Sequence, residues 1–240
     1  MTRRRWIADE VSGNKAALSG PHADHLTRVL RARVGQEFDI VANGIVRRGT
    51  VSGISDTRVE FELGDEIQSP SSALNLTLLL AIFKFDRMEW AIEKCTELGV
   101  ARILPVIAAR TEKHLAQAAS KRVERWRKIA RQAAEQSRQV FPPEVPDPVK
   151  LAECLRAQGG LRVVLSEVET SLELKNALAP NAPSLTLAFG PEGGWRDDEL
   201  ADFVNAGWTS ASLGSTILRA ETAVIAAVAV CGSMLNSERR

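Results

Sequence analysis

A glycine-rich corner that contains a carboxylate is the first feature of this sequence that could do chemistry. Residues 190–195 read GPEGGW, follow an apolar segment and carry Glu192 inside the corner. Glycine corners often bind phosphate, but this spacing matches neither G-x-G-x-x-G nor G-x-x-x-x-G-K-S/T, the two standard nucleotide motifs. A carboxylate at this point would also repel a pyrophosphate, so a small ligand with positive charge fits the corner better than ATP or NAD.

The acidic residues around the corner allow a structural and a functional interpretation. Asp197, Asp198 and Glu199 begin the next helical segment, where carboxylates complement the helix dipole, and this accounts for them without a ligand. Glu192 lies between a proline and a glycine, where helix capping explains less. S-adenosylmethionine, which carries a sulfonium and an ammonium group, has the charge that such a corner would favour.

Two further loops follow strand-like segments. LSEVET occupies residues 165–170, and LGSTILRAETA occupies residues 213–223. In the second of these loops Gly214 permits close approach of the backbone, because it has no Cβ atom. Ile217 and Leu218 could flank an adenine ring.

A guanidinium and a carboxylate, Arg219 and Glu221, lie at the end of the same loop. In a ligand site these groups could stabilise developing charge or move a proton. They could equally form a structural ion pair or a helix cap, and their spacing alone does not decide between these interpretations.

The hydrophobic pattern predicts the elements that position these loops. Continuous apolar runs indicate buried strands, and helical stripes of apolar residues separate them. We expect strands at 74–83, 102–107, 161–166, 184–190 and 208–214, and helices at 86–99 and 120–140. This alternation is typical of a mostly parallel α/β sheet, in which ligands bind beyond the carboxyl ends of the strands. Because all three loops follow strands, we expect them to converge on one ligand site.

The first seventy residues have a different pattern. We expect a short helix at 21–32 and strands at 37–42, 45–51 and 58–63. Asn43-Gly44, between two of these strands, is a hairpin turn signal. Short strands with tight turns predict a small antiparallel β-barrel over residues 1–70, a linker at 68–73 and an α/β domain at 73–240.

Charge is distributed unevenly along the chain. Residues 1–150 hold 24 Lys and Arg against 19 Asp and Glu, whereas residues 151–240 hold 7 against 11. A basic front half suits contact with a polyanion such as RNA. Solvated charges on helix faces would give the same count.

The composition disfavours several other classes of protein. The three cysteines, Cys95, Cys154 and Cys231, are far apart, so neither a disulfide framework nor a metal site is expected. The apolar stretch 223–235 is shorter than the roughly 20 residues that span a bilayer. No apolar leader follows the first residues, so no signal peptide is predicted. We therefore expect a soluble cytoplasmic protein that contacts no membrane.

Five blocks of this sequence, in the right order, resemble the ribosomal RNA small-subunit methyltransferase E family of the SPOUT class. They are HLTRVLR (25–31), DRMEWAIEKCTELGV with ILPV (86–106), WRKIARQAAEQSRQVFPPEV (126–145), GPEGGW with DEL (190–200) and LGSTILRAETA (213–223). The resemblance implies a PUA-like barrel and an α/β domain with a deep C-terminal trefoil knot. It also implies a homodimer that transfers methyl from S-adenosylmethionine to N3 of one uridine in 16S ribosomal RNA. That uridine would lie near the decoding centre, and the assembled small ribosomal subunit would be the preferred substrate.

The resemblance also gives candidate site residues. The cofactor contacts would be Leu165, Ser166, Glu167, Phe189, Gly190, Pro191, Glu192, Gly193, Gly194, Leu213, Gly214, Ser215, Thr216, Ile217, Leu218 and Thr222. The expected RNA contacts are Arg28, Arg31, Arg33, Lys84, Arg87, Arg110 and Arg138. Two positions depart from the family pattern: Thr216 stands where a basic residue is usual, and Ala220 where threonine is frequent.

The catalytic residues would be Arg219 and Glu221. The N3–H of uracil is a weakly acidic imide, and Arg219 is expected to stabilise the negative charge that develops on the carbonyl oxygens. Glu221 would orient Arg219 or accept the proton, directly or through water. The alternatives are a SPOUT enzyme that acts on another ribosomal or transfer RNA nucleotide, and a non-catalytic RNA-binding factor in ribosome assembly.

Overall fold

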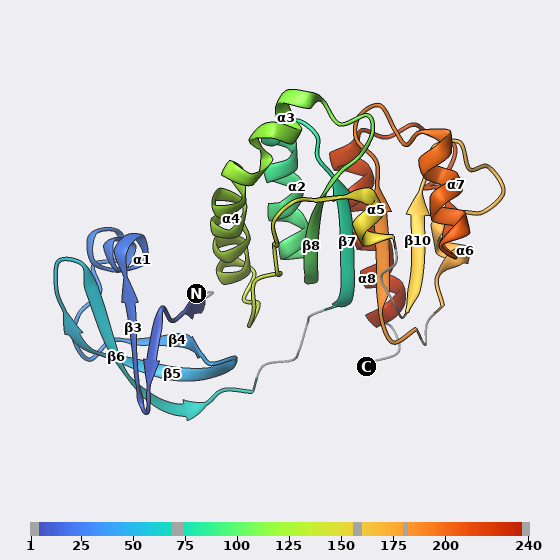
Figure 1. The fold of residues 1–240 in the computed structure, drawn as a ribbon. Helices are drawn as coiled ribbons and strands as arrows, with labels where there is room; N and C mark the ends of the chain where they lie inside the picture. Colours follow the sequence, from blue (N-terminus) through green and yellow to red (C-terminus); the bar gives the residue numbers. More distant parts are fainter. Residues whose placement is uncertain (1–4, 69–73, 156–159, 180–181, 237–240) are drawn as a thin grey trace. The chain divides into compact units, whose positions relative to one another are not determined.

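The structure is a computed structural model that describes residues 5–68, 74–155, 160–179 and 182–236 of the 240-residue chain. The chain divides into two compact units, which Figure 1 draws. The first comprises Met1–Ser72 and Ala134–Pro142, and the second comprises Ala73–Ala133 and Pro143–Arg240. Most of the expected linker, residues 69–73, lies outside the described residues.

The first unit is a curled six-stranded sheet. Its strands are β1 (Arg5–Ile7), β2 (Glu10–Ser12), β3 (Lys15–Ser19), β4 (Glu37–Ala42), β5 (Ile45–Ile54) and β6 (Arg58–Glu66), in the spatial order β1-β4-β5-β6-β3-β2. The predicted antiparallel arrangement is confirmed for every neighbouring pair except β1 and β4, which run parallel. The strand expected at 58–63 is confirmed as part of β6, and its alternate residues Val59, Phe61 and Leu63 are all buried in the core of this unit.

The expected helix at 21–32 is shorter and has two parts. Helix α1 (Gly20–Asp24) continues into a π-helical turn, η1 (His25–Val29). The ring of Trp6 contacts the rings of both His22 and His25, and Trp6 and Leu26 are fully buried. The inner side of this segment therefore belongs to the core of the first unit.

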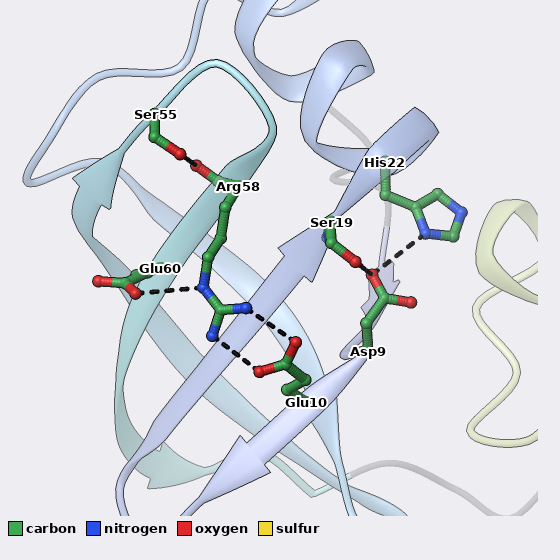
Figure 2. Close-up of polar contacts among 7 residues, drawn as sticks. All are labelled: Asp9, Glu10, Ser19, His22, Ser55, Arg58 and Glu60. Carbon is green, nitrogen blue, oxygen red and sulfur yellow. Dashed lines mark hydrogen bonds and ion pairs between the residues drawn. The ribbon is translucent and has the colours of Figure 1, made fainter.

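Charged residues on the sheet of the first unit pair with one another, as Figure 2 shows. Arg58 donates from Nη1 and Nη2 to the two carboxylate oxygens of Glu10 at 2.8 and 2.9 Å. Its Nε donates to Glu60 at 3.2 Å. Because β3 lies between β2 and β6, the Arg58–Glu10 pair fastens the edge strand β2 across its neighbour.

The segment Ala134–Pro142 brings a buried carboxylate into the first unit. The side chain of Glu135 is fully buried, and its Oε2 lies 3.4 Å from Nε2 of His22. The Nδ1 of His22 lies 3.8 Å from Asp9, which also accepts a 2.8 Å hydrogen bond from the backbone of Ser19 (Figure 2). His22 therefore lies between two carboxylates that come from distant parts of the sequence.

The second unit is built on a fully parallel sheet. Its strands are β7 (Leu74–Ala81), β8 (Val100–Ile107), β9 (Val149–Lys150), β10 (Leu161–Leu165), β11 (Leu185–Phe189) and β12 (Thr209–Ala211), in the order β12-β10-β11-β7-β8-β9. The predicted α/β class is confirmed. Since β10 lies between β12 and β11, the loops that follow these three strands leave the same edge of the sheet.

Helices cover both faces of this sheet. They are α2 (Phe85–Glu97), α3 (Lys113–Ala118), the 3-10 turn η2 (Ala119–Arg122), α4 (Val123–Gln136), α5 (Leu151–Cys154), α6 (Leu174–Ala177), α7 (Asp197–Asn205) and α8 (Ala220–Asn236). Leu78 and Leu80 of β7 face the core that α2, α4 and α8 share, whereas Leu79 and Ala81 face the core of α5 and α7. This two-sided burial explains why the sequence of β7 is a continuous apolar run.

The three cysteines lie in the core of the second unit. Cys95, Cys154 and Cys231 are buried free thiols, and burial raises the pKa of Cys154 to about 11 and that of Cys231 to about 12. Within the described ranges, no helix is both long and apolar enough to cross a membrane. In the same ranges, no group of three or more His, Cys, Asp or Glu side chains could hold a metal ion.

Candidate functional site

A cavity of about 470 Å³ lies at the carboxyl ends of β10, β11 and β12, and the three loops predicted from the sequence form it. Its lining residues are Arg87, Leu165, Ser166, Glu167, Phe189, Gly190, Pro191, Glu192, Gly194, Ser212, Leu213, Gly214, Ser215, Thr216, Ile217, Leu218, Arg219, Ala220 and Ala223. The volume lies in the range of about 300–1,000 Å³ that is typical of small-molecule sites. The expected convergence of the three loops is therefore confirmed.

Most of the residues expected to contact a cofactor line this cavity. Gly193 and Thr222 are not among the lining residues, and neither is Glu221. Three other lining residues, Ser212, Ala220 and Ala223, were missed. Ser212 directly precedes the predicted loop LGSTILRAETA (213–223), whereas Ala220 and Ala223 lie inside it but were not singled out as contacts.

Hydrogen bonds tie the GPEGGW corner to the ends of neighbouring strands. Arg110, which follows β8, donates from Nη1 to the carbonyls of Gly193 and Trp195 at 2.6 and 3.1 Å. The indole of Trp195 donates to the carbonyl of Leu165 at the end of β10 at 3.1 Å. The corner is therefore held from two strands.

Two carboxylates, those of Glu192 and Glu199, accept further hydrogen bonds that connect the corner and helix α7 to neighbouring segments. The carboxylate of Glu192 accepts a 3.2 Å hydrogen bond from the backbone of Lys84, which follows β7. Glu199 accepts from the backbone of Ala109 at 2.8 Å and from that of Arg196, the residue before α7, at 2.9 Å. The structure thus gives Glu192 a structural contact that the sequence did not indicate, and it gives Glu199 more than a helix-dipole role.

Gly194 has a backbone that requires glycine. Its φ is +68°, a conformation that other residues rarely adopt, and a Cβ atom would lie 2.2 Å from Oε1 of Glu167. The carboxylate that follows β10 therefore packs against the backbone that follows β11, which brings two of the three loops into contact.

Arg219 and Glu221 have different surroundings. Arg219 lines the cavity, and its carbonyl accepts a 2.8 Å hydrogen bond from the backbone of Ala223, so it is the residue directly before α8. Glu221 lies in the first turn of α8, and its Oε1 is 3.7 Å from Nε of Arg87. In the described part of the chain, the ion-pair partner of Glu221 is therefore Arg87, whereas the sequence suggested Arg219.

The basic residues expected to contact RNA lie in both units. In the first unit Arg28, Arg31 and Arg33 are exposed, and Arg28 forms an i,i+4 ion pair with Asp24 at 3.6 Å. Arg138 is also exposed, and its carbonyl accepts a hydrogen bond from the buried guanidinium of Arg5.

The three basic candidates of the second unit lie around the cavity region. The side chain of Lys84 is exposed, that of Arg87 lines the cavity, and that of Arg110 holds the glycine corner. Their roles toward RNA remain predictions.

Comparison with known proteins connects this cavity to a family. The RNA methyltransferase domain family matches residues 70–232 of the chain. A ribosomal RNA small subunit methyltransferase E from Rickettsia conorii is 31% identical over 237 residues, which cover 94% of this chain and 93% of the relative. The protein of that name from Bacillus subtilis is 31% identical and covers 88% of this chain and 87% of its own. The chain belongs to the ribosomal RNA small subunit methyltransferase E family.

Solved structures of similar proteins agree with this membership. A ribosomal RNA small subunit methyltransferase E from Neisseria gonorrhoeae, bound to S-adenosyl methionine, superposes with a TM-score of 0.85. It is 29% identical, and the match covers 96% of this chain and 97% of that one. A methyltransferase from Legionella pneumophila, also bound to the cofactor, has a TM-score of 0.86 and 28% identity, with 99% and 98% covered. The family fold, a parallel α/β sheet preceded by a curled sheet, is therefore the fold of this chain.

Proposed function

We propose that this member of the methyltransferase E family transfers methyl from S-adenosylmethionine to ribosomal RNA of the small subunit. The observation that carries the proposal is the cavity that the loops after β10, β11 and β12 form together. The finer assignment is N3 of one uridine in 16S ribosomal RNA, by a homodimer in the cytoplasm. The five sequence blocks that resemble the family support this finer assignment.

The residues of the cavity fit S-adenosylmethionine. Glu167 and Glu192 place carboxylates in the lining, which suits a ligand with a sulfonium and an ammonium group. Phe189, Leu213 and Ile217 supply apolar surface for an adenine ring. Gly194 keeps the corner close to the carboxylate of Glu167, because any side chain there would overlap it.

The chain's own groups supply placement and electrostatic stabilisation. Bound S-adenosylmethionine carries a methyl group that its sulfonium makes electrophilic, so that the S–C bond breaks with its electron pair on sulfur as the N–C bond forms. Arg219 donates to a carbonyl oxygen of the base and stabilises the negative charge that the base carries once the N3 proton has left to solvent. The cavity walls hold donor and acceptor in line, which removes much of the entropic barrier.

The first unit is proposed to bind the RNA backbone. Arg28, Arg31 and Arg33 are exposed, and Arg31 and Arg33 form no ion pair with any residue that the structure describes. Guanidinium groups in this state are available to phosphate oxygens, and contacts of this kind fix position on RNA without reading the sequence. The first unit would thus hold the RNA by its backbone.

The proposal is tested by methyl transfer to defined RNA substrates. Small subunits and free 16S RNA are prepared from cells that lack this gene and are incubated with the purified protein and methyl-labelled S-adenosylmethionine. Mass spectrometry of the digested RNA is expected to show one new N3-methyluridine, with more product on subunits than on free RNA. Label on a different nucleotide would overturn the assignment to N3 of a uridine. Binding of S-adenosylmethionine without any methyl transfer would contradict an enzymatic role and would support an assembly factor.

A further inference from the structure

Glu221 is a buried carboxylate whose hydrogen bonding is incomplete. Its side chain is 9% exposed, and its Oε2 has no hydrogen-bond partner among the residues that the structure describes. A buried charge without full compensation is costly, so proteins retain one where it serves a purpose. The position of Glu221 in the first turn of α8 offsets part of the cost, because the helix dipole favours a negative charge there.

The one cation beside Glu221 in the described structure comes from helix α2. Nε of Arg87 lies 3.7 Å from Oε1 of Glu221, and α2 packs directly against α8. Arg87 is in the first turn of its own helix, where a cation opposes the helix dipole, so helix electrostatics does not explain the charge. The pair therefore joins the starts of two packed helices, each at the edge of the cavity.

Arg87 extends from this ion pair to the cavity wall. It lines the cavity together with Arg219, and its side chain is 32% exposed. A guanidinium has five N–H donors in a planar fork, so the Nε side can face Glu221 while the terminal nitrogens face a ligand. Glu221 does not line the cavity, whereas Arg87, its ion-pair partner, does.

We propose that Glu221 is a positioning residue for Arg87, and that Arg87 is a second catalytic guanidinium that contacts the target base beside Arg219. Arg87 donates to one carbonyl oxygen of the pyrimidine, and Arg219 donates to the other or to the same developing oxyanion. Two guanidinium groups share the negative charge that appears when the base loses its N–H proton to solvent. Glu221 keeps Arg87 in place and does not take the proton itself.

This inference rests on the proposed function, and it changes the roles expected from the sequence. There, Glu221 was to orient Arg219 or act as a base, and Arg87 was an RNA contact. In the structure, Arg219 forms no ion pair with any described residue, whereas Arg87 and Glu221 form one. The base that this site would recognise carries an imide N–H between two carbonyl groups. Each carbonyl oxygen can accept a hydrogen bond from one of the two guanidinium groups.

A double-mutant cycle tests the coupling between Arg87 and Glu221. The variants are Arg87→Ala, Glu221→Gln and the double variant, with kcat and KM measured for methyl transfer to small subunits, and Kd for S-adenosylmethionine measured by calorimetry. Each single change is expected to lower kcat by about tenfold to hundredfold and to leave the Kd for the donor within about twofold. The double variant is expected to be no slower than Arg87→Ala, because Glu221 acts through Arg87.

A conservative variant and a control pair separate this role from a structural one. Arg87→Lys is expected to recover part of kcat, because it keeps the charge but loses the planar fork. The control is the pair of Glu89 and Arg125, in which a residue of the same helix α2 forms a 2.7 Å ion pair away from the cavity lining. Glu89→Gln and Arg125→Ala are expected to leave kcat unchanged.

The outcomes distinguish this inference from the proposed function. If the unmodified protein transfers no methyl, the proposed function fails. If it is active and Arg87→Ala keeps full kcat, only the pairing inference fails. If the fold-loss of kcat in the double variant is the product of the two single fold-losses, Glu221 acts independently of Arg87. If the pH profile of kcat is altered in Glu221→Gln, Glu221 is the base. Either result overturns the positioning role of Glu221.

Discussion

Charged residues in the two units are used in different ways. In the curled sheet of the first unit, Arg58 satisfies both oxygens of Glu10 and also pairs with Glu60, so the group is complete by itself (Figure 2). In the second unit, Arg219 lines the cavity and has no ion pair among the described residues, and Glu221, which does not line the cavity, has one oxygen without a hydrogen bond.

The contrast separates charges that stabilise the fold from charges that are available to a ligand. A completed surface pair contributes little to stability, and its loss is local. The buried Glu221 costs stability where its Oε2 lacks a partner, whereas the exposed guanidinium of Arg219 stays solvated and available to a ligand. This distinction predicts that mutations around the cavity change activity more than stability. Mutations in the ion pairs of the first unit are predicted to change both activity and stability only slightly.

The largest effect is expected for Arg219. Loss of the guanidinium in Arg219→Ala removes a donor to the developing oxyanion, and kcat is expected to fall by about 10²–10³-fold while the Kd for S-adenosylmethionine stays nearly constant. Steady-state kinetics and calorimetry measure the two quantities. Arg196→Ala is the matched control, because Arg196 pairs with Asp198 outside the cavity lining. Full activity in Arg219→Ala would contradict the claim that the unpaired guanidinium at the cavity serves the reaction.

The next largest effect is expected for the glycine corner. Gly194→Val forces a branched side chain into a positive φ and against Glu167, which costs about 1–3 kcal/mol of backbone strain alone. The Kd for S-adenosylmethionine is expected to rise by roughly tenfold to hundredfold in calorimetry.

Gly13→Val is the control variant, because it introduces the same backbone strain at a position outside the cavity. Gly13 has a φ of +56° in the first unit and no heavy atom near its missing Cβ. It is expected to lower the thermal midpoint while the donor affinity is retained. Equal loss of donor binding in both variants would mean that the corner acts only through global stability.

A smaller effect is expected for Arg110, which ties the corner to β8. Arg110→Ala removes the hydrogen bonds to Gly193 and Trp195, and the Kd for S-adenosylmethionine is expected to rise about tenfold, which corresponds to about 1.4 kcal/mol. The control is Arg102→Ala, since Arg102 in the same strand pairs with Glu144. Weaker RNA binding with unchanged donor affinity would instead support the RNA contact expected from the sequence.

The smallest effect is expected for the completed pairs of the first unit. Arg58→Gln should lower the thermal midpoint slightly and leave methyl transfer unchanged. The Arg58 guanidinium holds the pKa of Glu10 below its usual value through their hydrogen bonds. The contribution of the pair is therefore present above the ordinary Glu pKa of about 4.3 and is lost as the pH falls through the lower folded value. A thermal midpoint difference that grows in acid would contradict this sign.

The sequence predicted the second unit well because its strands are buried on both faces. The run at 74–83 and the segment 184–190 are continuous apolar stretches, and they form β7 and β11 close to the expected limits. The long basic helix was predicted less well, because Ser120 lies in the turn η2 and α4 begins at Val123. Val123 and Trp126 at the start of α4 are buried in the core of the second unit, and helix ends are the part of an element that sequence patterns place least well.

The sequence predicted which loops form the site, but it did not predict which side chains of the site contact one another. Glycine spacing and strand ends indicated which loops would meet, because parallel strands put their carboxyl ends at one edge. The sequence gave no sign that Glu192 accepts from Lys84, since the two residues are far apart in the chain. The same holds for Glu135, whose buried carboxylate meets His22 of the first unit.

By itself, the amino-acid sequence determined the alternation of strands and helices, the three loops of the site and the residue types available to a ligand. Only the tertiary structure decided which charges pair: Arg87 with Glu221, Arg110 with the carbonyls of the corner, and Glu199 with Ala109. The physical reason is that local patterns follow from short-range backbone and side-chain periodicity. Partners of a charged group, in contrast, depend on which distant elements packing brings within about 4 Å.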